Sequence, residues 1–554
     1  MGRIKIMVIH NRKYYLVLLL VVLFAGFLRL YRLDSYPVGF HIDEASLGYN
    51  GYSMLKTGKD EHGNRLPLYI DMFGDNRPSG YHYLTIAPIA VFGLNEFATR
   101  LPGTVFGTLT VVAFYFFVLV LFKDKKLALL CSFLMAISPW HIVSSRASAE
   151  SVVALFFIIT GFACIVRSLE HQDIRLSIFG FSSLVSSFFF YHTPRIFVPL
   201  LLICIIAFIR KSLKTYSRTF KLTGLVCSIA VFYISFLLIF VVKGGTGRFN
   251  QVNIFGSPET KLVMEEQLRE DGTRAVQPLI SRVFHNKVIN YSETFLTNYL
   301  DYFSGKFLFM SGGRPLWYKV PNVGMMLIME LPFIILGFIY LFIQKNNLMK
   351  IPLIWLFVAP IVASITMDDI PNVQRSLAMF PMLEVVAGYG IMTVITSFLK
   401  KKRNGVIFFV VLAVLFNFAY FLHQYFVHGS SHQTSNRFNG FKEMVSSVKD
   451  VYNQYDHIIV TKTSGGIYPH ILFFMKYDPF VYQMEGSPKD KDFGGFGKFI
   501  FAKEFCPSIS GSDRFPKTGK ILYVDSGSCV IPPLQKQKKI YREDGTLVFI
   551  IVYP

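Results

Sequence analysis

The chain alternates between long apolar runs and short polar connections. The runs are roughly 17–23 residues long, the length that a helix needs to cross about 30 Å of hydrocarbon. Arg29, Tyr31 and Arg32 end the first run as residues of a membrane interface would. The pattern predicts about eleven transmembrane helices, at residues 14–30, 101–122, 127–143, 148–166, 176–193, 196–210, 221–243, 322–343, 351–366, 376–399 and 405–426.

The composition favours a membrane protein over a soluble one. The 554 residues are 52% hydrophobic and include 57 Phe. A soluble chain of this length would dilute its apolar fraction with polar surface. The expected fold class is therefore mainly α, a polytopic protein of the cytoplasmic (inner) membrane. No small-residue cleavage site follows the first run, so we expect it to remain as a span.

The formal net charge is +21, and much of the excess positive charge lies in every second connection between the apolar runs. By the positive-inside rule, this alternation places the N-terminus inside and residues 31–100, 244–320 and 428 onward outside. Residues 82–95 are apolar but short for a span, and their crossing would invert the alternation, so we expect an interfacial helix there. No nucleic-acid-binding motif accompanies the charge, so no nucleic-acid partner is expected. The basic connections are the N-terminus, Lys123/Lys125/Lys126, Arg167/Arg175, Arg210/Lys211/Lys214/Arg218/Lys221, Lys345/Lys350 and Lys400/Lys401/Lys402/Arg403.

The tail after Tyr425 is polar and changes character. Short β-like runs flank an apparent helix at Pro469–Tyr477, which predicts a small α/β domain over residues 428–554, outside the membrane domain of residues 1–427. Cys506 and Cys529 lie in this external tail, where a disulfide forms readily, but the sequence leaves their pairing open. The β-like runs are His457–Thr461, Lys498–Ala502, Ile521–Asp525 and Leu547–Val552.

Two adjacent carboxylates, Asp43 and Glu44, follow the first span by about ten residues and are the candidate catalytic acids. A partly desolvated carboxylate near the interface is a stronger base and can deprotonate an attacking hydroxyl. Only one of two neighbouring side chains can point into a given site. We expect Asp43 to be the base and Glu44 to hold an arginine or a helix N-terminus. The alternative is that the pair merely begins a helix as a cap and a first-turn acid.

Four arginines are candidate ligands of a donor phosphate, because a guanidinium offers forked, charge-assisted hydrogen bonds. Arg77 lies where the chain returns to the membrane, and Arg146, Arg195 and Arg375 lie in short external loops or at helix ends. The alternative explanations are contact with lipid head groups for Arg77, and snorkelling or a structural pair, such as Arg146 with Glu150, for the other three.

Four polar aromatic residues near these charges are candidate substrate-binding residues: His41, Tyr81, His82 and Tyr191. No two histidines share a ligand spacing, and no CxxC motif occurs, so no metal site is predicted. Since arginines can neutralise a single phosphate, no cofactor is required.

Several motifs together resemble the polyprenyl-phosphate-dependent glycosyltransferases of family 39, which include protein O-mannosyltransferases and aminoarabinose transferases that modify lipid A. The resemblance covers most of residues 15–395. It rests on His41-Ile-Asp-Glu44, Asn76-Arg-Pro-Ser-Gly-Tyr81, Phe97-Ala-Thr-Arg-Leu-Pro-Gly103, Ser138-Pro-Trp-His with Arg146, Tyr191-His-Thr-Pro-Arg195, and Arg375-Ser-Leu ahead of Ala387-Gly-Tyr-Gly390.

This resemblance implies a C-type membrane fold, a donor presented on the outer side, and an inverting transfer of a hexose-type sugar to a hydroxyl group. It implies Asp43 as the catalytic carboxylate and Arg77 among the ligands of the carrier phosphate. Family members often have Lys where Arg77 stands, and the MIR domains of eukaryotic protein mannosyltransferases are absent. The acceptor, whether protein, lipid or glycan, therefore stays open. A transporter or flippase, and a ligase that uses a diphosphate-linked donor, are the alternative functions.

Overall fold

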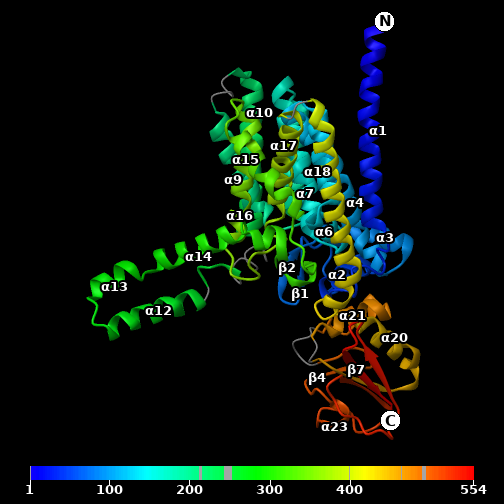
Figure 1. Cartoon of the computed structure of the whole chain (residues 1–554). Helices are drawn as coiled ribbons and strands as arrows, with labels where there is room; N and C mark the ends of the chain where they lie inside the picture. The colour runs from blue at the N-terminus through cyan, green and yellow to red at the C-terminus, as the bar shows by residue number, and fades with distance from the viewer. Residues whose placement is uncertain are drawn as a thin grey trace. The chain divides into compact units, whose positions relative to one another are not determined.

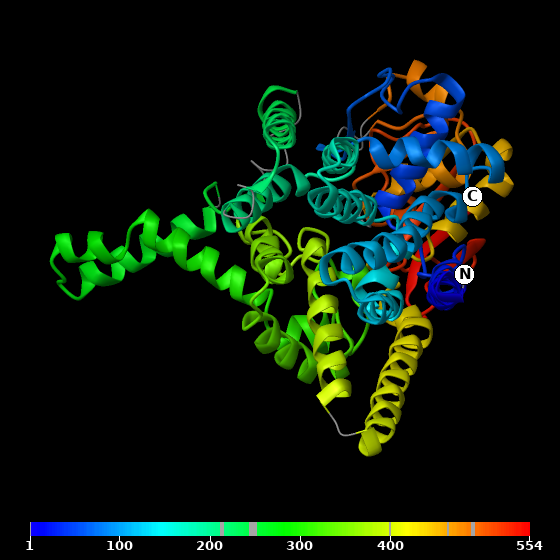
Figure 2. The same ribbon diagram turned by 90° about the horizontal axis from the view of Figure 1, so that it is seen from above.

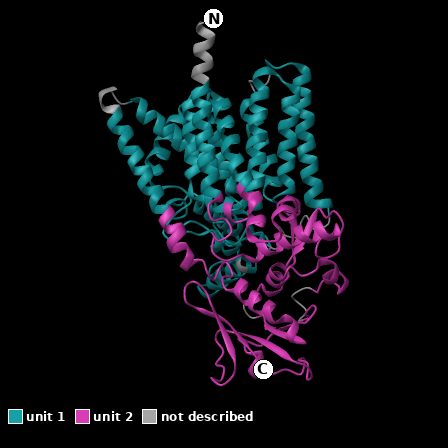
Figure 3. Cartoon of the chain, turned by 90° about the vertical axis from the view of Figure 1, so that its right-hand side faces the viewer, with its two compact units in different colours: residues 1–29, 105–145, 149–421 teal, residues 30–104, 146–148, 422–554 magenta. Residues whose placement is uncertain are grey.

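The computed structural model describes residues 2–210, 215–242, 252–256, 258–397, 400–462, 465–488 and 494–553. Lys211, Lys214 and the first residues of the 244–320 segment lie outside the described residues. Contacts divide the chain into two compact units (Figure 3). Unit 1 contains residues 1–29, 105–145 and 149–421, and unit 2 contains residues 30–104, 146–148 and 422–554. The domain boundary expected after residue 427 stays a prediction.

Unit 1 is built from helices, which Figures 1 and 2 show from two perpendicular directions. Its helices are α1 (Gly2–Leu30), α4 (Glu96–Phe122), α5 (Lys125–Ile137), α6 (Pro139–Arg146), α7 (Glu150–His171), α8 (Ile174–Ser186), α9 (Pro194–Ile209), α10 (Arg218–Phe236), α12 (Pro258–Thr273), α13 (Pro278–Phe284), α14 (Lys287–Asp301), α15 (Leu331–Phe342), α16 (Ile351–Ser364), α17 (Phe380–Ser397) and α18 (Lys400–His423). The ends of α1, α4, α6 and α18 belong to unit 2.

Seven helical segments in the described residues are long and apolar enough to cross a membrane. They are Arg12–Leu30, Glu96–Phe122, Glu150–His171, Arg218–Val241, Asn347–Ser364, Leu377–Ser397 and Asn404–His432. The pair α5 and α6, bent by 55°, passes the same test together, and Ile174–Phe189, Pro194–Ile209 and Ile328–Phe342 are shorter apolar helices. Every predicted run therefore contains an apolar helix, which confirms a multi-pass membrane protein. The count of eleven crossings and their orientation stay predictions.

Small residues allow two helices of unit 1 to approach closely. Gly337 of α15 faces the backbone of Val386 in α17, and Gly390 of α17 faces the backbone of Phe333 in α15. A Cβ atom at either glycine would overlap these backbone atoms. Close contact of this kind replaces the hydrophobic effect as a source of helix association in lipid.

Unit 2 combines the external segment after α1 with the C-terminal tail. Its first part contains α2 (Ile42–Thr57), a hairpin of β1 (Tyr69–Met72) and β2 (Asp75–Pro78), and α3 (Gly80–Phe92). Helix α3 covers most of the predicted interfacial segment. Its second part contains α19 (Gly429–His432), α20 (Phe441–Val451), β3 (His457–Thr461), α21 (Ile467–Met475), α22 (Pro479–Met484), β4 (Phe499–Ala502), α23 (Pro507–Ser510), β5 (Ile521–Ser526), β6 (Gln537–Tyr541) and β7 (Leu547–Val552).

The tail forms a mixed five-stranded sheet in the order β4-β3-β5-β7-β6. Strand β3 is parallel to β4 and β5, whereas β7 is antiparallel to β5 and β6. The predicted α/β character is confirmed, and the four predicted strands match closely. Strand β6 was missed because its sequence, Gln-Lys-Lys-Ile-Tyr, is mostly polar, which is common in edge strands.

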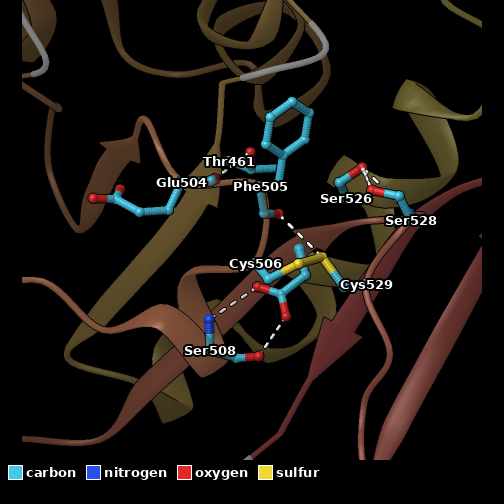
Figure 4. The surroundings of a disulfide bond; sticks show 9 residues. Thr461, Glu504, Phe505, Cys506, Ser508, Ser526, Ser528 and Cys529 are labelled. Carbon is cyan, nitrogen blue, oxygen red and sulfur yellow. Dashed lines mark hydrogen bonds between the residues drawn. A yellow bond between two sulfur atoms is a disulfide. The ribbon is translucent and has the colours of Figure 1, made fainter.

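A disulfide joins Cys506 and Cys529, whose Cα atoms are 5.7 Å apart, and so resolves the pairing that the sequence left open (Figure 4). The bond links the chain before α23 to the loop after β5. Beside it, the backbone N–H of Ser508 donates to Asp525 Oδ1 at 3.0 Å. The cross-link therefore lies beside β5, the middle strand of the sheet.

One hydrophobic core joins both parts of unit 2. Helix α2 contributes Ala45 and Tyr49, and the tail contributes Ile471 of α21 and Phe549 of β7, all of them buried. Helix α2 is in contact with both α21 and α22. The helix that carries the candidate carboxylates is thus fixed by packing against the tail.

Candidate functional site

The site begins at the N-terminus of α2, which a capping box fixes. The side chain of His41, the N-cap, accepts a hydrogen bond from the backbone N–H of Asp43 at 3.2 Å. In return, the backbone N–H of His41 donates to Glu44 Oε2 at 3.1 Å. This reciprocal pattern satisfies two N–H groups that have no partner within the helix. It also sets the directions in which Asp43 and Glu44 leave the helix.

Glu44 is buried among basic residues. Its carboxylate accepts hydrogen bonds from Arg100 Nε at 2.9 Å and from Ser148 Oγ at 3.2 Å, and it forms an ion pair with Arg437. Although burial raises the pKa of Glu44, the charges of Arg100 and Arg437 outweigh burial and lower it to about 2. Glu44 is therefore an ionised structural anchor that joins α2 to the start of α4 and to the tail.

Asp43 points away from this buried cluster and remains partly accessible. Its Oδ2 atom lies 2.9 Å from Arg77 Nη1, and the two side chains are 17% and 22% exposed, respectively. Arg77 also contacts Asp75 through Nε, at 3.3 Å. The structure thus brings together the two residues that the sequence analysis proposed as base and phosphate ligand.

The β1–β2 hairpin determines the position of Arg77. Phe73 and Gly74 form its two-residue turn, with φ values of 59° and 84°. Positive φ at both residues is the conformation of a type I′ turn, which favours glycine and matches the twist of a hairpin. Asp71 Oδ1 accepts the backbone N–H of Gly74 at 2.7 Å and stabilises the turn. Arg77 pairs with Ile70 across the two strands, so its side chain starts from a defined register.

The candidate substrate-binding residues in unit 2 are buried. Burial lowers the pKa of His41 to about 4, so its ring is neutral at pH 7, and Nδ1 can accept the hydrogen bond from Asp43. Tyr81 donates to the carbonyl of Thr99 at 3.1 Å and accepts the N–H of Gly103 at 3.1 Å. His82 is fully buried, and burial, with a contribution from Arg77, lowers its pKa to about 3. Of these residues, His41 contacts Asp43 directly, and Tyr81 joins α3 to the start of α4.

Arg146 also belongs to unit 2 and is fully buried. Its Nη2 atom donates to the carbonyls of Tyr31 at 2.7 Å and Tyr36 at 3.2 Å, and its Nε atom donates to the hydroxyl of Tyr425 at 3.3 Å. These bonds hold the end of α6 to the chain that follows α1. Glu150 falls in unit 1, so the ion pair expected between it and Arg146 stays a prediction.

The remaining candidates, Arg195, Arg375 and Tyr191, lie in unit 1. Arg195 donates to the carbonyl of Phe188 through Nε at 3.0 Å and Nη2 at 2.8 Å. Arg375 forms an ion pair with Asp368 at 2.9 Å. Tyr191 and Arg375 line one narrow cavity of about 20 Å³, large enough for about one water molecule. The structure therefore brings these two candidates together.

Comparison with known proteins gives the family context of this arrangement. Residues 19–242 match the family described as dolichyl-phosphate-mannose-protein mannosyltransferase. No curated protein sequence matches the chain. One similar solved structure is the archaeal oligosaccharyltransferase AglB from Archaeoglobus fulgidus, in complex with an inhibitory peptide and a dolichol-phosphate. It is 12% identical to this chain, with a TM-score of 0.52. The match covers 84% of this chain but only 64% of AglB. ArnT from Cupriavidus metallidurans, in the apo state, is 11% identical, with a TM-score of 0.50 and 98% of both chains covered.

The chain has the fold of a C-type glycosyltransferase. The family match covers the first span, Asp43, Arg77 and the helices up to α10. The family match and the fold support a glycosyltransferase of the membrane. In this C-type fold, the paired Asp43 and Arg77 lie in the segment that follows the first span.

The sequence did not identify three charged residues that form ion pairs with the candidate site residues. Arg100 and Arg437 neutralise Glu44, and Asp75 shares Arg77 with Asp43. Arg100 had a visible signal, because it precedes the second span within Phe97-Ala-Thr-Arg-Leu-Pro-Gly103. Arg437 had none, because it lies almost 400 residues from Glu44 along the chain.

Proposed function

We propose that this chain is an integral membrane glycosyltransferase that moves a hexose-type sugar from a polyprenyl-phosphate carrier to a hydroxyl acceptor outside the cytoplasm, with inversion. The observation that carries the proposal is the accessible ion pair in which Asp43 Oδ2 lies 2.9 Å from Arg77 Nη1. Asp43 lies at the start of α2, which the buried ion pair of Glu44 with Arg100 joins to α4. The match to a family named for a dolichyl-phosphate-mannose donor supports it. The dolichol-phosphate named with the archaeal structure of the same fold supports a polyprenyl carrier.

In the proposed reaction, Asp43 accepts the proton of the acceptor hydroxyl as its oxygen attacks the anomeric carbon. The new carbon–oxygen bond forms on the face opposite the carrier, and the bond from the anomeric carbon to the phosphate oxygen breaks. The electron pair of that bond leaves with the phosphate monoester. Attack from the opposite face inverts the configuration of the anomeric carbon.

Arg77 would stabilise the charge that develops on the departing phosphate, because a guanidinium offers charge-assisted hydrogen bonds to phosphate oxygens. In the present structure it pairs with Asp43 and Asp75. Donor binding would draw Arg77 toward the phosphate and leave Asp43 free to accept a proton. Arg146, Arg195 and Arg375 are proposed as further phosphate ligands, and His41, Tyr81, His82 and Tyr191 as residues that shape the substrate site.

The proposal is tested with the purified chain and a panel of polyprenyl-phosphate sugars, by measuring free carrier phosphate and transferred sugar. Asp43→Asn should lower the transfer rate by about 10²–10⁴-fold, the usual contribution of a general base. Asp75→Asn is the matched control, since it removes the other carboxylate on Arg77 but leaves the base in place. Arg77→Gln should lower kcat by about 10²–10³-fold.

Transfer by Asp43→Asn at the rate of the parent would overturn the role of Asp43. An equal loss in Asp75→Asn would show that the carboxylates act only by holding Arg77. A parent protein that moves the lipid-linked sugar across a vesicle membrane without releasing carrier phosphate would support the transporter alternative instead.

A further inference from the structure

An apolar groove of about 330 Å³ lies in unit 1, where α7, α8, α9 and α10 meet near their ends. Phe162, Phe181 and Leu202 form part of its buried wall. Ile206 and Leu225 also line it, and they are 39% and 57% exposed, so the groove opens on the outer surface of these helices. An apolar space of this kind accepts an apolar ligand, because water finds no hydrogen-bond partners there.

Small residues create the groove. Gly224 and Ser228 of α10 and Ser168 of α7 line it, and a Cβ atom at Gly224 would meet nothing within 4 Å. Ser228 Oγ donates to the carbonyl of Gly224 at 2.8 Å. Ser168 Oγ donates to the carbonyl of Ile165 at 2.7 Å. Both hydroxyl groups are thus satisfied within their own helices, and the wall requires no polar ligand.

One end of the apolar groove is basic. Lys221 lines it, and Arg218 precedes Lys221 by three residues, so both side chains leave the same face of the first turn of α10. Both side chains are exposed. In the part of the chain that the structure describes, no carboxylate lies within ion-pair distance of either residue.

The acids of the neighbouring connection already have partners. The backbone N–H of Ser217 donates to Gln172 Oε1 at 2.8 Å, which joins the connection before α10 to the one between α7 and α8. In that second connection, Glu170 forms an ion pair with Arg167, and Asp173 caps α8. The uncompensated positive charge beside an apolar groove is complementary to a lipid with an anionic head group.

We propose that this groove binds one anionic phospholipid, with an acyl chain against the apolar wall and the phosphate at Arg218 and Lys221. Basic pockets between transmembrane helices bind anionic lipid head groups in this way. The alternation of basic connections predicts that this end of α10 lies on the side of the membrane opposite to residues 31–100. The carrier phosphate, proposed to contact Arg77, would therefore lie on the other side. A bound acyl chain would fill the space that the small residues leave among the four helices.

The test measures the Kd of added phosphatidylglycerol and phosphatidylcholine for the purified full-length protein in detergent, by native mass spectrometry. We expect one site that binds anionic phosphatidylglycerol about tenfold more tightly than zwitterionic phosphatidylcholine. Arg218→Gln combined with Lys221→Gln should raise the Kd of phosphatidylglycerol about tenfold and leave that of phosphatidylcholine unchanged. Gly224→Leu places a side chain in the groove and should raise the Kd of both lipids about tenfold.

Two matched controls separate these effects from general changes of charge and helix sequence. Arg12→Gln with Lys126→Gln removes two exposed basic residues from other connections of unit 1. Gly405→Leu changes a glycine of α18 whose added Cβ would also meet nothing within 4 Å. Both control proteins should bind phosphatidylglycerol as the parent does.

Three outcomes would overturn the proposal. The first is equal affinity of the parent for the two phospholipids. The second is a change in Arg218→Gln with Lys221→Gln, or in Gly224→Leu, no larger than in its control. The third is tighter binding of undecaprenyl phosphate than of phosphatidylglycerol, lost in Gly224→Leu, because a polyprenyl chain would then occupy the groove. The assay contains no sugar donor or acceptor, so its outcome is independent of glycosyl transfer.

Discussion

Replacement of Glu44 by glutamine should lower the stability of α2 and leave the side chain of Asp43 in place. Arg100 and Arg437 lower the pKa of Glu44 to about 2, from an ordinary value of 4.5. This difference corresponds to about 3 kcal/mol of folding free energy, present above pH 4.5 and lost as the pH falls toward 2. A neutral amide at this position would remove the carboxylate charge that both buried guanidinium groups contact. We therefore expect Glu44→Gln to lose about 3 kcal/mol at pH 7, in line with the cost of breaking a buried pair.

Hydrogen exchange followed by mass spectrometry, on peptides that cover α2, measures this effect directly. A loss of about 3 kcal/mol corresponds to exchange that is roughly 150-fold faster at pH 7. In the parent, the protection of α2 should also fall between pH 5 and pH 3 after correction for intrinsic exchange. In Glu44→Gln this pH dependence should disappear.

Glu443→Gln provides the control, since Glu443 is an exposed acid of the same unit. Exchange in Glu44→Gln within threefold of the parent would refute the reasoning, because the ion-pair network would then contribute little. An equally large effect in Glu443→Gln would show that net charge, rather than the buried network, controls the stability of α2.

Three further predictions concern unit 2, each measured by hydrogen exchange. Burial raises the pKa of Glu61 to about 7, so ionisation of Glu61 lowers the stability of the folded protein as the pH rises from 4.5 to 7. Glu61→Gln should therefore raise the free energy of unfolding by up to about 3 kcal/mol at pH 8 and leave it unchanged at pH 4. A Cβ at Gly48 would lie 2.5 Å from the ring of Phe473, so Gly48→Ala should lose about 1–3 kcal/mol at α2, and an unchanged value would contradict this packing. Cys506→Ser with Cys529→Ser should lose about 2–4 kcal/mol at β5, and reductant should reproduce the loss in the parent only.

The sequence predicted the fold where local patterns determine it. Apolar runs of spanning length and β-like runs in the tail correspond to helices and strands of the structure. Alternation of apolar and polar residues could not predict that α2 packs against α21, because this contact joins segments more than 400 residues apart. Contacts group the tail with residues 30–104, a grouping that the sequence pattern did not indicate.

The candidate site was predictable to the extent that its residues lie close in sequence. Asp43, Glu44 and Arg77 share one external segment, and their residue types indicate a base and a phosphate ligand. The partition of the two carboxylates required the structure. Successive residues of a helix point about 100° apart, so when one faces the core its neighbour faces sideways. Burial of Glu44 against Arg100 and Arg437 thus directs Asp43 toward Arg77.

The different directions of the two carboxylates also separate the arginines around them. Arg100 and Arg437 lie at the buried carboxylate, and Arg77 lies at the accessible one. Arg100 and Arg437 both form ion pairs with Glu44, which fixes their charges in the buried cluster next to Asp43. Such a fixed charge acts strongly because burial reduces screening by solvent and salt. In the proposed reaction, arginines far apart in the sequence would therefore serve two different purposes: Arg100 and Arg437 fix the helix that carries Asp43, and Arg77 contacts the donor phosphate.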